Sequence, residues 1–161
     1  MDYLWTPWRY RYIADAEKDE GCVFCDALAA NDDAKTLIVF RGRKNFIILN
    51  RYPYTSGHVM VVPYVHSADL AACDSDTTAE MMALAQRSQA ALEKTYHPQG
   101  YNLGMNLGKA AGAGVTHHLH MHVLPRWSGD SNFMTVVGET RVEPEDLDTT
   151  YEKLRKALAV G

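Results

Sequence analysis

Three histidines alternate with apolar residues in one short stretch, His118-Leu119-His120-Met121-His122. On a β-strand successive side chains point to opposite faces, so the three imidazoles are expected on one face, roughly 6–7 Å apart. Each imidazole can act as a base, a nucleophile or a metal ligand near neutral pH. Packing of the core does not require three imidazoles together, and each imidazole would need a hydrogen-bond partner if it were buried. The stretch therefore predicts a metal site or nucleophilic catalysis at phosphorus.

The composition limits the partners of the chain. Its 161 residues are enough for one domain with a core of its own. A formal net charge of −4 gives no general attraction to nucleic acid or to an anionic membrane. No apolar run reaches the length of a membrane span, and the first residues lack a signal-peptide pattern. Three cysteines, two of them in a C-x-x-C, fit a reducing compartment. We expect a cytoplasmic protein that binds neither nucleic acid polymers nor membranes.

The hydrophobic pattern predicts an α+β fold with an antiparallel sheet of about five strands. The strands are expected over 36–40, 46–49, 58–63, 101–107 and 118–124. A long helix is expected over 77–96, begun by the capping-box spacing of Thr77 and Glu80. Shorter elements are a helix ending near Asn31, a strand near 134–137 and a last helix from about Pro144. Residues 1–21 are expected to form an aromatic arm, and residues 22–161 a single domain.

The histidine stretch resembles a known family. Residues 118–124 match the H-φ-H-φ-H-φ-φ motif of the histidine triad (HIT) family, where φ is apolar. Residues 49–53 and 57–61 resemble the nucleotide-pocket segment of its diadenosine-polyphosphate branch. The likeness spans roughly residues 22–127. Segments 5–9 and 127–134 are similar to a bacterial branch linked to diadenosine tetraphosphate phosphorylases. The resemblance implies that residues 22–161 form one HIT domain.

The resemblance implies roles for individual residues. His120 would be the nucleophile that attacks an α-phosphate and forms a nucleotidyl-histidine, which water or phosphate then resolves. His122 would bond a phosphate oxygen, and His58, in its Gly-His-Val context, would be a further active-site histidine. Asn50 matches a ribose-contacting position and Asn106 a phosphate-contacting amide. From the residues alone, His58 could also be a structural histidine of a strand, and Asn50 could equally be a turn former.

The loop before the triad departs from the family pattern. Its glycines, including Gly112 and Gly114, allow backbone N–H groups to approach a phosphate closely. Relatives often carry Gln followed by Ser or Thr here, whereas this chain has Ala113-Gly114 and one extra residue before the triad. A hydroxyl donor is therefore missing, and Thr116 is the candidate substitute.

A pair of cysteines, Cys22 and Cys25, forms the C-x-x-C. Such a pair can be redox-active or bind metal, and the βαβ context typical of redox motifs is absent. Zinc needs about four ligands. The resemblance to zinc-containing HIT proteins and hexose-1-phosphate uridylyltransferases implies that His66 and His118 complete a closed, structural Cys₂His₂ site. His117, next to His118, is a competing candidate.

Four functions remain open at this point. The first is an enzyme that cleaves an adenine nucleotide with a substituted α-phosphate, such as the dinucleoside polyphosphate diadenosine tetraphosphate, by phosphorolysis or hydrolysis. Alternatives are a nucleoside phosphoramidase and a nucleotide-binding sensor with slow turnover. The last is a zinc-binding structural domain that binds no nucleotide. The family resemblance also implies a homodimer.

Overall fold

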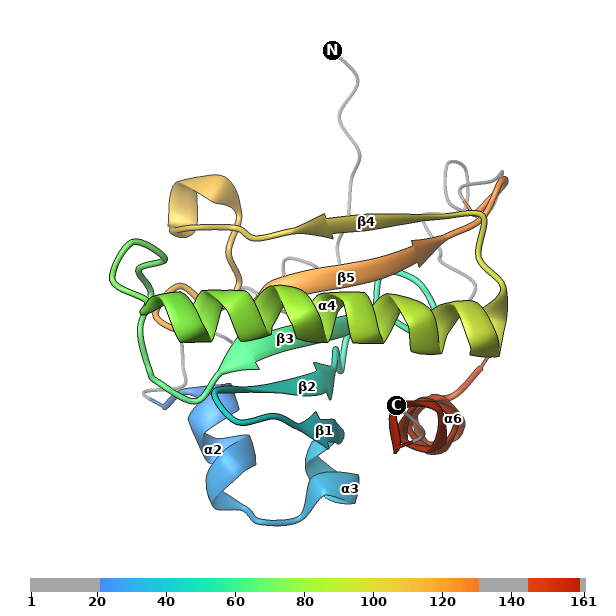
Figure 1. Ribbon diagram of the computed structural model, residues 1–161, viewed down its shortest axis with the longest axis horizontal. Coiled ribbons are helices and arrows are strands. Elements are labelled where there is room, and N and C mark those ends of the chain that lie inside the picture. Colours follow the sequence, from blue (N-terminus) through green and yellow to red (C-terminus); the bar gives the residue numbers. More distant parts are fainter. Residues whose placement is uncertain (1–20, 131–144, 160–161) are drawn as a thin grey trace.

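Five strands form one antiparallel sheet in the computed structural model, which describes residues 21–130 and 145–159 (Figure 1). The strands lie in the order β1-β2-β3-β5-β4. Their bounds are β1 (Ile38–Arg41), β2 (Asn45–Leu49), β3 (Val59–Pro63), β4 (Gly100–Gly104) and β5 (Met121–Arg126). The predicted α+β class with five strands is confirmed. The aromatic arm, up to residue 20, and the strand expected near 134–137 lie outside the described residues.

Two longer helices pack on the sheet. Helix α4 (Ser75–Tyr96) runs across one face, and α6 (Leu147–Ala159) packs against both α4 and β1 (Figure 1). Every residue of the central strands β2 and β3 is buried, so the core lies along them. Shorter helices are α2 (Val23–Ala29), α3 (Asp33–Thr36) and the 3₁₀ turn η1 (Lys109–Ala111). No helix in the described ranges is long and apolar enough to cross a membrane.

The histidine strand begins later than the alternation suggested. β5 starts at Met121, so His118 and His120 precede it, and the expected start at His118 is wrong. The reason is that the backbone before Met121 has a different hydrogen-bond partner. The backbone N–H of Leu119 donates to the carbonyl of Ser67 (2.7 Å), in the loop after β3, instead of entering the β3 ladder. The chain therefore bends before the regular strand begins.

The limits of the other strands also differ from expectation; β3, for example, begins at Val59 and not at the expected His58, and the larger differences are at the start of β1 and the end of β4. β1 begins at Ile38 because the preceding Leu37 ends α3 in the left-handed region, with φ of 67°. β4 ends at Gly104, so the predicted continuation to residue 107 is wrong. The last helix begins at Leu147, and the expected start at Pro144 lies outside the described residues.

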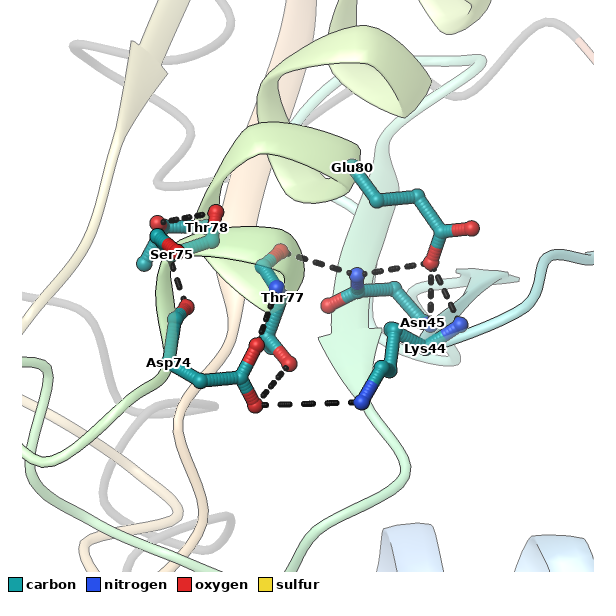
Figure 2. Close-up of polar contacts among 7 residues, drawn as sticks. All are labelled: Lys44, Asn45, Asp74, Ser75, Thr77, Thr78 and Glu80. Carbon is teal, nitrogen blue, oxygen red and sulfur yellow. Dashed lines mark hydrogen bonds and ion pairs between the residues drawn. The ribbon is translucent and has the colours of Figure 1, made fainter.

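Helix α4 begins two residues before the expected position and has a different cap. The carboxylate of Asp74 accepts hydrogen bonds from the backbone N–H (2.8 Å) and the hydroxyl (2.9 Å) of Thr77 (Figure 2). Asp74 is therefore the N-cap, and the predicted capping box of Thr77 and Glu80 is wrong. With the cap formed by another residue, the Glu80 side chain is available to the neighbouring turn.

Glu80 fastens α4 to the turn between β1 and β2 (Figure 2). Its carboxylate accepts hydrogen bonds from the backbone N–H groups of Arg43, Lys44 and Asn45 and from the Asn45 side-chain amide. Burial raises the pKa of Glu80, but these donors outweigh it and hold the pKa below its usual range. The ionised carboxylate thus satisfies four N–H donors at once.

Replacing Glu80 with alanine is expected to lower the free energy of unfolding by about 3 kcal/mol, because three backbone N–H groups and the buried Asn45 amide lose a charged acceptor. Asn45 is fully buried, so water cannot replace the carboxylate at its amide. Chemical denaturation measures the change. The matched control Glu152→Ala removes an exposed carboxylate on α6 and should cost less than about 0.5 kcal/mol. Equal costs for the two variants would contradict the role of Glu80.

Candidate functional site

Strand register brings His58 and His122 together. β3 pairs with β5 so that Met60 lies opposite His122. His58 precedes Met60 by two residues and therefore points to the same face of the sheet. The two imidazoles meet with His58 Nε2 2.9 Å from His122 Nδ1. His58 is almost fully buried, at 1% exposure.

His120 lies beside this pair, with its ring centroid 4.9 Å from that of His122 and the planes at 77°. Its Nδ1 is 2.9 Å from the backbone carbonyl of His118. A carbonyl can only accept, so Nδ1 carries the proton and Nε2 keeps a lone pair. Burial lowers the pKa of His120, although the bond to the carbonyl partly opposes this. The ring is a neutral imidazole with a free nitrogen, as a nucleophile at phosphorus requires.

Burial also keeps His122 neutral. Burial, together with the smaller effect of the nearby His120, lowers the pKa of His122 to about 4. Among the described residues, the rings packed against His122 are those of His58, His120 and Tyr54. Near neutral pH His120 and His122 are therefore uncharged imidazoles.

Sequence reasoning missed Tyr54. Its ring centroid is 4.9 Å from that of His58 and 6.1 Å from that of His122. Periodicity does not place a side chain in the β2–β3 connection, and the neighbouring Pro53 indicated a loop and nothing more. Asn50, predicted to contact ribose, has its amide nitrogen 3.3 Å from His58 Nδ1.

The remaining predicted nucleotide contacts lie in the connection from β4 to β5. These residues are Asn106, Gly112, Gly114 and Thr116. Gly112 has φ of 85°, a conformation that favours glycine. Asn106 is half-buried and Thr116 is exposed. Their contact with a nucleotide stays a prediction.

Four predicted metal ligands come together on the other side of His118. The ligand atoms of Cys22, Cys25, His66 and His118 all lie within 4.8 Å of one another. His118 Nδ1 is 3.2 Å from Cys22 Sγ and 3.7 Å from Cys25 Sγ, and His66 Nδ1 is 3.3 Å from Cys25 Sγ. Ligands around a tetrahedral zinc are separated by about 3.5 Å. The cluster has the donor types and the size that suit zinc.

The surroundings of the cluster also suit a cation. His118 Nε2 lies 2.9 Å from the carbonyl of Pro63, which fixes the proton there and leaves the Nδ1 lone pair toward the sulfurs. Burial and the neighbouring Cys22 raise the pKa of the Cys25 thiol, so a thiolate pair needs a positive charge beside it. His117 is exposed and outside the four-residue cluster, with its ring 5.5 Å from that of His66.

Comparison with known proteins decides the family. The HIT domain family matches residues 31–129, well over half of the chain. The chain belongs to the HIT family. A protein named AP-4-A phosphorylase from Mycobacterium tuberculosis is 39% identical over 161 residues, which cover 96% of this HIT protein and 83% of the relative. The comparisons support an enzyme and leave phosphorolysis and hydrolysis open.

Solved structures share the fold of this HIT protein. A zinc-bound histidine triad family protein from Mycobacterium smegmatis is 34% identical with a TM-score of 0.71, covering 87% of this chain and 94% of that one. A hypothetical histidine triad nucleotide-binding protein from Sulfolobus tokodaii is 27% identical with a TM-score of 0.70, covering 86% and 93%. The first of these structures is a zinc-bound protein with the same fold. The Cys₂His₂ cluster of this chain is consistent with zinc.

Proposed function

We propose that this HIT protein cleaves a dinucleoside polyphosphate, such as diadenosine tetraphosphate, through a nucleotidyl-histidine on His120. The observation that carries the proposal is the Nδ1–H of His120 bonded to the His118 carbonyl, which leaves Nε2 as a lone pair beside His122. The 39% identity to a protein named AP-4-A phosphorylase supports this class of substrate.

The reaction proceeds in two displacements. In the first, His120 Nε2 attacks the α-phosphorus, an N–P bond forms, and the bond from phosphorus to the bridging oxygen breaks to release the other nucleotide. In the second, water or phosphate attacks the same phosphorus and the N–P bond breaks, which restores His120. Splitting one difficult substitution into two easier ones is the general advantage of covalent catalysis. His122 donates a hydrogen bond to phosphate oxygen as negative charge moves.

Binding of the nucleotide is assigned to the polar groups that flank the histidines. Asn50 contacts ribose, and the β4–β5 connection holds phosphate through Asn106, Thr116 and the N–H groups near Gly112 and Gly114. The adenosine end therefore lies over the end of the β2–β3 hairpin, and the phosphates over the segment that leads into His120.

The proposal also includes a bound metal and an oligomeric state. Zinc bound by the Cys₂His₂ cluster is structural, because its four ligands leave no open position. Strand β4 lies at the edge of the sheet and carries the exposed Leu103, which supports association into a homodimer. None of the three cysteines is in a disulfide, which suits a cytoplasmic protein.

Product analysis tests the activity. The protein is mixed with diadenosine tetraphosphate with and without inorganic phosphate. ADP and ATP that appear only with phosphate identify a phosphorylase, and AMP and ATP in both cases identify a hydrolase. Tight nucleotide binding without turnover would contradict the enzyme and favour a sensor.

The pH dependence follows from the neutral histidines. Since the pKa of His122 is lowered from 6.5 to about 4, the neutral donor form persists as pH falls from 8 to 5 and is lost near pH 4. We expect kcat/KM for diadenosine tetraphosphate to show no inflection near the ordinary histidine pKa. Zinc content is measured at each pH, so that loss of metal is recognised. An acid limb centred near 6.5 would contradict the assignment.

A further inference from the structure

The C-x-x-C that supplies two metal ligands also has the geometry of a redox pair. Cys22 is the N-cap of α2 and Cys25 lies in the first turn of that helix. Residues at this spacing are neighbours on a helix surface. The two Sγ atoms lie within 4.8 Å of each other, and neither cysteine is in a disulfide. A small adjustment of the side chains can therefore bring the two sulfurs to bonding distance.

Exposure differs between the two sides of the cluster. Cys25 is half-buried, and His66, whose Nδ1 is 3.3 Å from Cys25 Sγ, is exposed. Cys22 and His118 are buried, with Sγ and Nδ1 3.2 Å apart. A small solute that enters from solvent therefore meets the sulfur of Cys25 first, with Cys22 sheltered behind it. An accessible sulfur beside a second cysteine that can resolve it is typical of oxidation-sensing sites.

A residue between the two sulfurs lies against the proposed nucleophile. Phe24 is buried, and its ring centroid is 5.3 Å from those of both His118 and His120. The same turn of α2 contacts His118 through Cys22, and the His118 carbonyl accepts the Nδ1–H of His120 at 2.9 Å. A change at the cysteines therefore reaches His120 in two ways, through a packed aromatic ring and through a backbone carbonyl.

We propose that Cys25 is a site of oxidation by hydroperoxides, and that the resulting disulfide between Cys22 and Cys25 inactivates the His120 site. The effect on turnover rests on the proposed function, whereas the modification itself does not. A disulfide leaves two nitrogen donors in the cluster, those of His66 and His118, which are too few for a structural zinc site. Disulfides in cytosolic proteins are usually transient and redox-sensing, so the modification suits a cytoplasmic protein.

The oxidation proceeds in two steps. Metal binding keeps both sulfurs as thiolates, the form that reacts. In the first step the Cys25 thiolate attacks a peroxide oxygen, the O–O bond breaks, the leaving oxygen anion takes a proton, and Cys25 becomes a sulfenic acid. In the second step the Cys22 thiolate attacks the Cys25 sulfur, the S–S bond forms, and the hydroxide that leaves is protonated to water. The two sulfurs lose two electrons in total, which the peroxide takes up.

Hydrogen peroxide is the probe, added to full-length, zinc-loaded protein that carries Cys73→Ser. This substitution removes the thiol outside the cluster, so any thiols that disappear are those of Cys22 and Cys25. Both should be lost as zinc is released, mass spectrometry should find the disulfide between them, and dimedone should trap a sulfenic acid on Cys25. Dithiothreitol with added zinc should restore the thiols and the metal. Zinc that stays bound in peroxide, or a sulfenic acid trapped on Cys22 instead, would overturn the inference.

Hydrogen exchange shows whether oxidation reaches the nucleophile, without any substrate. The backbone N–H of Leu119, next to His120, donates to the Ser67 carbonyl at 2.7 Å. Its exchange should become at least about tenfold faster on oxidation. The amides of Phe46 and Val62, which pair across β2 and β3, should keep their protection. Unchanged exchange at Leu119 would overturn the link to His120, and faster exchange at all three amides would show global unfolding and overturn it as well.

Turnover of diadenosine tetraphosphate gives the functional measurement. It should fall at least about tenfold in the oxidised protein, since small displacements of a reacting group are costly, and it should return with dithiothreitol and zinc. Unchanged turnover in protein that has formed the disulfide would overturn the inactivation. If the reduced wild type has no turnover, the proposed function fails, while zinc release, the disulfide and hydrogen exchange still decide the modification.

Cys25→His is the matched variant. Its imidazole is a zinc ligand without a sulfur to oxidise, so its zinc content and turnover should be the same with and without peroxide. Loss of zinc from this variant in peroxide would place the oxidation elsewhere and overturn the role of Cys25. If Cys25→His holds no zinc from the start, the dimedone adduct in the Cys73→Ser protein still identifies the oxidised sulfur.

Discussion

Replacing His120 with alanine should reduce turnover of diadenosine tetraphosphate by about 10⁴-fold or more, the usual cost of removing a catalytic nucleophile. The reason is that His120 alone combines a lone pair on Nε2 with an Nδ1–H fixed by a backbone carbonyl. Nucleotide affinity should change little, because ribose and phosphate contacts are assigned to other residues. Steady-state product formation and calorimetric titration with a nucleotide measure the two effects separately.

The adjacent His117 provides the control for this substitution. It is exposed and lies outside both the catalytic and the metal clusters. His117→Ala should therefore retain wild-type turnover and zinc content. A His120→Ala protein with more than about a tenth of wild-type turnover would show that the nucleophile has been misassigned.

Replacing Cys22 with serine should remove zinc and destabilise the fold. Structural zinc sites bind with about 10–16 kcal/mol, and loss of a ligand gives up much of it. The effect should reach the catalytic histidines through Phe24, whose ring centroid is 5.3 Å from those of both His118 and His120. We expect the thermal unfolding midpoint to fall by at least about 10 °C.

Zinc analysis and thermal unfolding of purified protein measure this effect, with Cys73→Ser as the control. Cys73 is a free thiol outside the Cys₂His₂ cluster, so its replacement should leave zinc at one equivalent per chain. Equal zinc in the wild type and in Cys22→Ser would contradict the ligand set.

The metal cluster and the nucleophile share one residue. His118 offers Nδ1 to the two sulfurs while its backbone carbonyl holds the ring of His120. Because His118 is held in place by the cluster, its carbonyl also fixes the tautomer of His120. Sequence spacing indicated that the two sites adjoin, but it did not show that a backbone carbonyl connects them.

Local patterns in the sequence predicted the sheet and the histidine cluster well. A continuous apolar run marked β3, alternation marked β5, and the C-x-x-C with the family resemblance led to the four residues that the structure brings together. Alternation failed at His118 and His120, where a tertiary hydrogen bond from Leu119 to Ser67 replaces the ladder. Residue types alone do not reveal that competition.

The wrong prediction of the α4 cap and the failure to predict Tyr54 have the same physical origin. Both Asp74 and Thr77 are good N-cap residues, and in the structure Asp74 caps α4 while Glu80 binds the β1–β2 turn, far away in sequence. Tyr54 meets His58 because the hairpin closes with a particular loop geometry. Such tertiary contacts depend on how separate parts of the chain meet in the folded protein.

The stereochemistry of the reaction at phosphorus tests the central claim most directly. Diadenosine tetraphosphate with sulfur in place of one non-bridging oxygen on the α-phosphorus is chiral there. Attack by phosphate gives a product that is still chiral at this phosphorus, and attack by water does so when the water carries a heavy oxygen isotope, so the configuration of either product can be determined. Two displacements through His120 each invert the phosphorus, so the account predicts net retention. Net inversion would show a single direct attack by water or phosphate and would contradict a nucleotidyl-histidine.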